Sequence, residues 1–352
     1  MNTLIIKKDD LRHNIEKIKE FALKSGQDDK GNSLKIIAVV KANGYGLGIV
    51  EYTRFLIDNG ISSFAVSTKE EAILLREAGI KEEILMLSAS GIKDELEELV
   101  ENDITLTLSS KEDAKVIDEL GEKLNRKIKV HLKIDTGFGR YGFIYSKRDE
   151  LVEIIKNLKN IEIVGTYTHF SVSFFDEKYT KLQFERFINV IEVLKMNKIE
   201  PGILHVCNSA AFLKYPYMHL NAVRIGSAFL GRLPFNDYLK LKKIAYLESE
   251  VTEIKELPKG FNIGYSNSYK TKKETRIAIV PCGYMSGYNV KAEDDLFRFI
   301  DKLRFLKNDI INLFKREALY VKINNEKYKV LGRVRSISLD SRYNRKTSRN
   351  WR

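Results

Sequence analysis

The first part of this chain alternates two patterns, and that alternation constrains the fold more than any other feature. Short runs of β-branched and aliphatic residues are separated by segments whose apolar residues recur at helical spacing, such as Lys69–Glu77, Lys111–Leu120 and Lys178–Leu194. The eight runs are Leu34–Val40, Ser62–Ser67, Glu83–Leu87, Ile104–Leu108, Lys127–Ile134, Glu162–Tyr167, Gly202–Val206 and Asn221–Ile225. Strands that alternate with helices pair in parallel, and eight such units in about 200 residues predict a (β/α)8 barrel. A doubly wound open sheet is the competing arrangement, but the chain lacks its GxGxxG turn.

A different pattern begins after Gly231. Strand-like runs continue there without comparable helical segments between most of them, at Tyr246–Leu257, Thr275–Pro281 and Leu319–Leu331. We therefore predict a barrel domain over residues 1–235 and a mostly β domain over residues 236–352. Val290–Phe314 is expected to be a helical insertion in the second domain, and Thr3–Ile6 is expected to pair with that domain.

Composition is that of a globular protein of the cytoplasm. The 352 residues are 43% hydrophobic and 31% charged, and no apolar run is long enough to span a membrane. The N-terminus carries charges where a signal peptide would need its apolar core. The two cysteines, Cys207 and Cys282, are far apart and indicate no disulfide framework, and no metal site is predicted.

A formal net charge of +12 raises nucleic acid as a partner. Five of those excess charges lie in the last twelve residues, however, and elsewhere lysine and glutamate are mixed as on solvated helix faces. With no nucleic-acid module in the sequence, we predict an enzyme with neither a nucleic-acid nor a membrane partner.

Chemistry in such a barrel lies at the carboxyl ends of its strands, and the first strand ends in Lys41. A lysine there either reaches solvent or has a lowered pKa, and a free amine can form a Schiff base with an aldehyde. Taken alone, Lys41 is more often an ordinary solvated lysine. The segment that follows, with Asn43, Gly44 and Tyr45, favours a ligand, since glycine permits close backbone approach and a tyrosine hydroxyl can bind phosphate.

Four other strand ends also carry polar residues. These are Lys133, Asp135 and Arg140; Thr168, His169 and Ser171; Asn208 and Ser209; and Arg224, Gly226 and Ser227. Each has a structural alternative: His169 as a core histidine, Asp135 with Arg140 as an ion pair, Gly226 as a turn. Agreement among five strands instead favours a site for an aromatic phosphate aldehyde. Hydroxyls and backbone N–H groups suit the phosphate, Arg224 suits a pyridine nitrogen, and Lys41 suits the aldehyde, which together describe pyridoxal 5'-phosphate.

Seven segments of the chain resemble the alanine racemase family of pyridoxal-phosphate enzymes. They are AVVKANGYGLG, HLKIDTGFGRYGF, GTYTHFS, HVCNSAAFL, AVRIGSAFLG, IGYSNSY and VPCGYMSGY, and they occur in family order over almost the whole chain. The resemblance implies a (β/α)8 barrel followed by a β domain, and a head-to-tail homodimer with shared active sites. It also implies an isomerase that interconverts L- and D-alanine and so supplies D-alanine.

The resemblance implies two opposed bases. Lys41 would hold the cofactor and act on the D face, and Tyr265 from the partner subunit would act on the other face. Arg224 would contact the pyridine nitrogen with support from His169. An arginine does not readily give up its proton, which leaves that nitrogen unprotonated and suits racemisation over transamination.

The remaining implied roles concern binding. Arg140 would bind the cofactor's phenolic oxygen and the substrate carboxylate, and Lys133 matches a position that is carbamylated in many relatives, where it orients that arginine. Tyr284 matches a tyrosine at the substrate entrance. The phosphate would be held by Tyr45, Ser209, Gly226 and Ser227, with Asn208 beside them at the cofactor.

The resemblance weakens towards the C-terminus. In GRVRSISLDS, Asp340 matches a family aspartate, while Ser338 and Leu339 stand where cysteine and methionine are common, so a substrate contact at Leu339 would run through the backbone. Beyond Ser341 the resemblance stops. We expect a β domain truncated at its C-terminus, without a tyrosine that bonds the phosphate in relatives, and a frameshift is our hypothesis for this tail.

Other functions remain open on the same residues. A racemase for serine, ornithine or lysine would use the same scaffold. A decarboxylase is disfavoured because it would want an acid in place of Arg224. A truncated, non-catalytic pyridoxal-phosphate-binding protein is the alternative from another class, and Tyr265 argues against it.

Overall fold

The computed structural model describes residues 2–25, 33–235, 238–290, 319–334 and 339–342, with short pieces at 302–303, 306–307 and 310–311. Its contacts divide the described chain into two units. The first runs from Lys7 to Ile244, and the second begins at Ala245 and includes the N-terminal strand. This division lies later in the chain than the predicted boundary at 235/236. Each unit is described by itself below.

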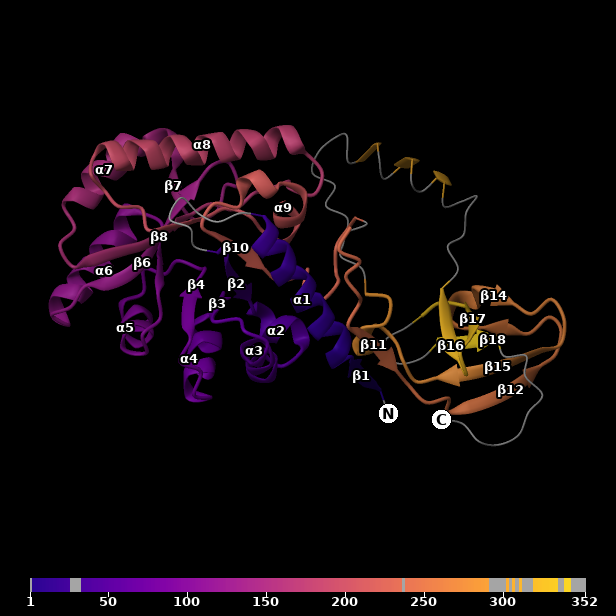
Figure 1. Cartoon of the computed structure of the whole chain (residues 1–352). Coiled ribbons are helices and arrows are strands. Elements are labelled where there is room, and N and C mark those ends of the chain that lie inside the picture. The colour runs from indigo at the N-terminus through magenta and orange to yellow at the C-terminus, as the bar shows by residue number, and fades with distance from the viewer. Residues whose placement is uncertain are drawn as a thin grey trace. The chain divides into compact units, whose positions relative to one another are not determined.

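Eight parallel strands form the barrel of the first unit (Figure 1). They are β2 (Lys35–Val39), β3 (Ser63–Val66), β4 (Glu83–Met86), β5 (Leu106–Leu108), β6 (Ile128–Asp135), β8 (Ile161–Tyr167), β9 (Ile203–His205) and β10 (Ala222–Ile225). They pair in the order β4-β3-β2-β10-β9-β8-β6-β5, and a parallel bridge between Leu85 and Thr105 joins the two ends. A ninth short strand, β7 (Phe143–Ile144), pairs with the end of β6. The predicted (β/α)8 barrel is confirmed.

Helices follow most of the barrel strands and cover the outside of the barrel, as α4, α5 and α8 show in Figure 1. They are α1 (Lys8–Lys24), α2 (Lys41–Gly46), α3 (Ile49–Asp58), α4 (Lys69–Glu77), α5 (Lys93–Glu101), α6 (Lys111–Lys123), α7 (Arg148–Lys156), α8 (Glu177–Met196) and α9 (Ser209–Lys214), with 3-10 turns η1 (Tyr145–Lys147) and η2 (Pro216–Met218). Side chains of Thr68, Ser110 and Asp176 cap α4, α6 and α8 by accepting backbone N–H groups of the first turn. These caps fix the loops at the carboxyl ends of the strands.

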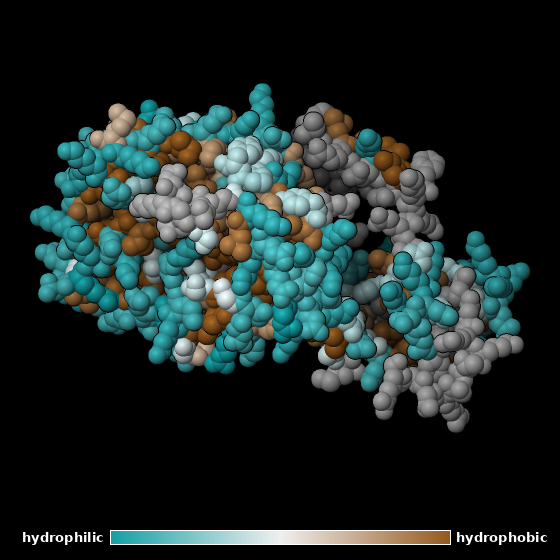
Figure 2. All heavy atoms as spheres, viewed as in Figure 1, coloured by the Kyte–Doolittle hydropathy of each residue, from teal (hydrophilic) through white to brown (hydrophobic). Residues whose placement is uncertain are grey.

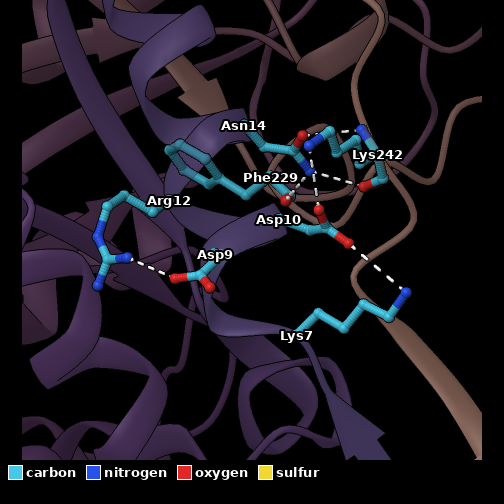
Figure 3. Close-up of polar contacts among 7 residues, drawn as sticks. All are labelled: Lys7, Asp9, Asp10, Arg12, Asn14, Phe229 and Lys242. Atoms are coloured by element: carbon cyan, nitrogen blue, oxygen red, sulfur yellow. Dashed lines mark hydrogen bonds and ion pairs between the residues drawn. The ribbon is translucent and has the colours of Figure 1, made fainter.

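A buried asparagine fastens α1 to the last segment of the barrel unit. Figure 3 shows the amide of Asn14 between two backbone carbonyls: Nδ2 donates to the oxygens of Phe229 at 2.9 Å and Lys242 at 2.8 Å. The N–H of Lys242 donates back to Oδ1 at 2.8 Å, and the Lys242 ammonium lies 3.2 Å from Asp10. Asn14 is fully buried, so these three bonds satisfy a side-chain amide that has no access to water.

The second unit is mostly β. Its strands are β1 (Thr3–Ile6), β11 (Ala245–Glu248), β12 (Glu253–Leu257), β13 (Asn262–Ile263), β14 (Tyr269–Lys270), β15 (Thr275–Val280), β16 (Tyr320–Ile323), β17 (Glu326–Leu331) and β18 (Leu339–Arg342), with 3-10 turns η3 (Tyr265–Asn267) and η4 (Tyr284–Ser286). Five form one antiparallel sheet in the order β12-β15-β18-β17-β16 (Figure 1). The expected pairing of Thr3–Ile6 with this domain is confirmed, since β1 is antiparallel to β11.

Several sequence expectations fall on other parts of the chain. The helical insertion predicted at Val290–Phe314 lies outside the described residues except for its first residue and three short pieces, and so do Ser338 and the tail after Arg342. In the described part of the chain, no helix is long and apolar enough to cross a bilayer. Figure 2 shows mostly hydrophilic side chains on the visible face of the barrel unit, with apolar ones between them.

Candidate active site at the carboxyl end of the barrel

Lys41 starts a left-handed turn at the end of β2. The next four residues, Ala42 to Tyr45, all have φ between 53° and 63°, a conformation that costs about 1–2 kcal/mol for each residue with a Cβ. Asn43 holds the turn: its N–H donates to Glu71 at 3.1 Å, and its Oδ1 accepts the N–H of Ile49 at 3.0 Å. Strain of this kind is maintained at ligand sites. The turn leaves Lys41 exposed, without an ion pair to any described residue.

Tyr45, at the end of the turn, lies against the backbone of Gly226. A Cβ added to Gly226 would stand 2.1 Å from the Tyr45 hydroxyl oxygen, so only glycine permits this approach. Ser209 lies on the other side, where its Oγ accepts the N–H groups of Gly226 at 3.1 Å and Ala228 at 3.3 Å. Burial raises the pKa of Tyr45 to about 12, with Glu71 adding to the effect, so the hydroxyl stays a hydrogen-bond donor. The residues predicted for a phosphate therefore converge.

Arg224 on β10 is 3% exposed, and both of its Nη atoms donate hydrogen bonds. Its Nη1 donates to Nδ1 of His205 at 2.7 Å and to the His205 carbonyl at 2.8 Å, and its Nη2 donates to the Thr168 carbonyl at 2.7 Å. Nη2 also lies 3.3 Å from the carbonyl oxygen of Val206 and 3.4 Å from Nδ1 of His169. Within the described residues Nε–H has no partner. Burial lowers the pKa of Arg224 to about 10, which still leaves the guanidinium charged at neutral pH.

Lys133 is a buried amine whose charge is disfavoured by Arg224 and Arg140. It is 6% exposed and makes no ion pair with a described residue; its Nζ lies 5.2 and 5.3 Å from the ring centres of Tyr167 and Tyr141. Burial first, and then Arg224 and Arg140, lower its pKa to about 7, although Asp135 opposes them. About half of this amine is therefore unprotonated at neutral pH, which a carbamylation reaction requires.

Asp135 organises the loop that carries Arg140. Its Oδ1 accepts N–H groups of Gly137 at 2.9 Å, Phe138 at 2.8 Å and Gly139 at 3.2 Å. The Asp135–Arg140 ion pair considered from the sequence is not formed, since Asp135 bonds the backbone instead. Arg140 stacks on the Phe138 ring, 4.4 Å from its centre, and lines an open cavity of about 410 Å³. Its guanidinium makes no ion pair within the described chain and remains available to an anion.

The other barrel residues take supporting places. Asn208 caps α9, where its Oδ1 accepts N–H groups of Ala210 at 3.1 Å and Ala211 at 3.0 Å. His169 packs edge-on against Phe138, and burial together with Arg224 holds its pKa well below the usual range. Ser227 follows Gly226 and is half-buried. The structure thus brings the predicted barrel residues to one end of the barrel.

Three predicted residues belong to the second unit, so their place beside the barrel stays a prediction. Tyr265 opens η3 and is 67% exposed, and Tyr284 opens η4 and is 48% exposed. Leu339 pairs with Val280 in the sheet.

Comparisons with known proteins agree with this geometry. The model of the alanine racemase N-terminal domain matches residues 6–234, and that of the alanine racemase C-terminal domain matches residues 244–336. The chain belongs to the alanine racemase family. Members of this family are isomerases.

Similar alanine racemases come from several organisms. That of Methanococcus maripaludis is 37% identical over 284 residues, which are 79% of this chain and 74% of the relative. That of Carboxydothermus hydrogenoformans is 38% identical over 80% of this chain and 74% of its own length. Among solved structures, Clostridium difficile alanine racemase matches with a TM-score of 0.81, at 29% identity over 99% of this chain and 84% of that one. Bacillus anthracis alanine racemase with bound L-Ala-P has a TM-score of 0.79, at 27% identity over 99% and 83%.

Sequence reasoning about this alanine racemase family member missed two histidines under Arg224. His205 and His131 lie in the barrel interior, and both are fully buried. Alternation along β6 was the available signal, because His131 and Lys133 must share one face of the strand. Nothing in the sequence showed that His205 would meet His131.

Proposed function

We propose that this chain interconverts L- and D-alanine, in the cytoplasm, on pyridoxal 5'-phosphate held at the carboxyl end of the barrel. Membership of the alanine racemase family supports the reaction. The observation that carries the proposal is Arg224: a buried, charged guanidinium whose remaining donor, Nε–H, has no partner among the described residues. That donor suits a pyridine nitrogen that accepts a hydrogen bond without being protonated.

The residues present fit the cofactor. Gly226 lacks a Cβ, and the Tyr45 hydroxyl lies where one would stand, while Ser209 Oγ accepts the N–H of Gly226. The Ser209 hydroxyl accepts two backbone N–H groups and still has its own O–H to donate, as the phosphate of the cofactor requires. Tyr45, Ser209, Gly226 and Ser227 would hold the phosphate, with Asn208 keeping α9 in place. His169 would support Arg224 from the mouth of the barrel.

Proton transfer at the substrate Cα is assigned to two residues. When bound, pyridoxal phosphate withdraws electrons from Cα and so makes its proton acidic. Lys41 removes or returns this proton on one face, and Tyr265 does so on the other. Racemisation needs both, because a single base returns the proton to the face it came from.

Substrate orientation is assigned to the loop after β6. Arg140 would bind the carboxylate of alanine, since its guanidinium is exposed and makes no ion pair among the described residues. Lys133, with its pKa near 7, would be carbamylated and so become an anion between two cations. That anion would fix the direction of the Arg140 side chain. Tyr284 and the backbone at Leu339 would form the substrate entrance.

We further propose a homodimer in which Tyr265 of the partner subunit completes each site. Mixing a Lys41→Ala protein with a Tyr265→Phe protein tests this directly. In a mixed dimer one site then holds both native residues, so random reassociation should restore about a quarter of the wild-type activity. If both bases come from one chain, the mixture stays inactive.

Deuterium exchange at Cα tests the reaction and the substrate together. Incubation in D2O should exchange the Cα proton of L-alanine faster than that of L-serine or L-ornithine, and faster exchange of either of these would assign the other racemase instead. Lys41→Ala should abolish exchange and cofactor attachment. Lys111→Ala is the matched control, because Lys111 also begins a helix after a barrel strand and is exposed. Absence of exchange with all three amino acids would refute the proposed function.

A further inference from the structure

Two imidazoles form a chain beneath Arg224 inside the barrel. Nη1 of Arg224 is 2.7 Å from Nδ1 of His205, and Nε2 of His205 is 2.7 Å from Nδ1 of His131. Both histidines are fully buried, and the ring of His205 stacks on Tyr167 with centres 4.9 Å apart and planes 6° apart. The chain runs from the proposed cofactor site into the barrel interior.

The direction of every hydrogen bond in this chain follows from the arginine. A guanidinium has donors and no acceptor, so Nδ1 of His205 must accept. The proton of a neutral His205 is then on Nε2, which donates to Nδ1 of His131. His131 must in turn carry its proton on Nε2. Both rings are therefore neutral Nε2–H tautomers, assigned from their partners.

Local backbone features create room for His131. The pairing of β6 with β8 shifts its register between Val130 and His131. Opposite the ring stands Gly165, where a Cβ would lie 2.6 to 2.8 Å from three atoms of the imidazole. Gly165 has no left-handed φ, so contact with His131 is what restricts this position to glycine. A bulge and a glycine thus accommodate one buried polar ring.

The row of hydrogen bonds from Arg224 ends at His131, in a buried N–H that no described residue accepts. Nε2 of His131 has no hydrogen-bond partner among the described residues, and an unsatisfied buried donor destabilises the fold. Burial lowers the pKa of His131 to about 4; Glu83 opposes this, while Lys35 and Arg224 add to it. An apolar side chain would avoid the unsatisfied donor, so core packing does not explain a histidine here.

We propose that His131 is a positioning residue, which fixes His205 as an acceptor towards Arg224 and thereby holds Nε–H of Arg224 at the cofactor's ring nitrogen. Without the acceptor on His131, the Nε2–H of His205 is buried with no partner, so the tautomer that Arg224 requires loses this stabilisation and the Nδ1–H tautomer becomes accessible. That N–H would point at Nη1 of Arg224, two donors would face each other, and the guanidinium would turn away. The part that concerns the cofactor rests on the proposed function above.

Nitrogen NMR of the cofactor-free protein tests the hydrogen bonds from Arg224 to His205 and from His205 to His131, and it needs no activity measurement. The sequence has five histidines, so 15N-histidine spectra are assignable by single substitutions. We expect Nε2–H tautomers for both His131 and His205, and a coupling across the hydrogen bond between Nε2 of His205 and Nδ1 of His131. A charged ring or an Nδ1–H tautomer at either position would overturn the inference. Such a result would leave the proposed racemase untouched, and a failure of deuterium exchange would leave the NMR result untouched.

Cofactor binding tests the consequence. Pyridoxal phosphate and its 1-deaza analogue, which has C–H in place of the ring nitrogen, differ only in the acceptor for Arg224. Wild-type protein should prefer the natural cofactor by about 10- to 100-fold, as expected for one hydrogen bond from a charged group. His131→Leu should reduce this preference to near unity. His131→Asn, whose Oδ1 can replace Nδ1 as acceptor, should restore it. An unchanged preference in His131→Leu would overturn the inference.

A third variant separates position from chemistry. Gly165→Ala keeps His131 and displaces its ring, so it should also reduce the preference for the natural cofactor. If this variant and His131→Leu weaken both cofactors equally, the role of His131 is packing and the inference is wrong.

Discussion

Gly226→Ala should separate phosphate binding from every other part of the site. An added Cβ would stand 2.1 Å from the hydroxyl oxygen of Tyr45, 2.9 Å from Cζ and 3.2 Å from Cε2. To reach ordinary contact the hydroxyl must move by about 1.3 Å. The left-handed turn that ends at Tyr45 restricts such a movement, because Asn43 ties it to Glu71 and to Ile49. Overpacking of this kind costs about 1–3 kcal/mol.

Displacement of Tyr45 should cost the phosphate one charge-assisted hydrogen bond. Such a bond contributes about 1.5–3 kcal/mol, so the Kd for pyridoxal phosphate should rise by about 10- to 100-fold. Pyridoxal without its phosphate should bind Gly226→Ala and wild type equally. Titration of the cofactor-free protein by fluorescence quenching, with both ligands, measures the two constants.

Two further proteins make the result decisive. Gly91→Ala is the matched control, because a Cβ there meets nothing within 4 Å. Tyr45→Phe removes the oxygen that stands nearest to the new Cβ, so Gly226→Ala should cost less affinity in that background than in wild type. Equal losses for pyridoxal and pyridoxal phosphate, or equal losses in both backgrounds, would refute the phosphate assignment.

Two predictions concern stability. The pKa of Lys133 is about 7 in the folded chain, well below the ordinary lysine value of 10.5, so the folded state binds this proton less tightly. In CO2-free buffer, loss of the Lys133 proton should therefore increase the free energy of unfolding as pH rises from about 7 to 10. Lys133→Met should lack this increase. Urea denaturation of both proteins measures it, and identical pH slopes would contradict the prediction. Asn14→Ala removes three hydrogen bonds of a fully buried side chain and should lower the free energy of unfolding by about 2–4 kcal/mol. Asn157→Ala, at an exposed residue with one side-chain bond to Glu153, should change it by less than about 0.5 kcal/mol, and equal effects would contradict the assignment.

The barrel was predictable because hydrophobic periodicity and the parallel-strand rule act together. The predicted helix Lys69–Glu77 is α4 itself, and the run Leu34–Val40 contains β2. The predicted strand Ile104–Leu108 starts too early, since β5 begins at Leu106 and Thr105 makes only an isolated bridge. The site residues contributed by the barrel were also predictable, because the carboxyl ends of parallel strands meet at one end of a barrel.

The remaining features depend on contacts between distant segments. Local propensity accounts for Asn43 but not for Ala42 and Tyr45 in the left-handed turn after Lys41, and a bond from Asn43 to Glu71 helps to hold the turn. The meeting of His131 with His205 depends on a register shift and on the space at Gly165. The sequence predicted that Thr3–Ile6 pairs with the second domain, but it did not locate the division of the chain after Ile244.

The central claim is that Lys41 and Tyr265 act on opposite faces of the substrate Cα. Cα exchange of each alanine enantiomer in D2O, measured in the Tyr265→Phe protein, tests it most directly. Lys41 would remain able to remove and return the proton of D-alanine, so we predict that exchange into D-alanine persists with retained configuration while exchange into L-alanine is lost. Equal loss of exchange from both enantiomers would contradict the two-base assignment.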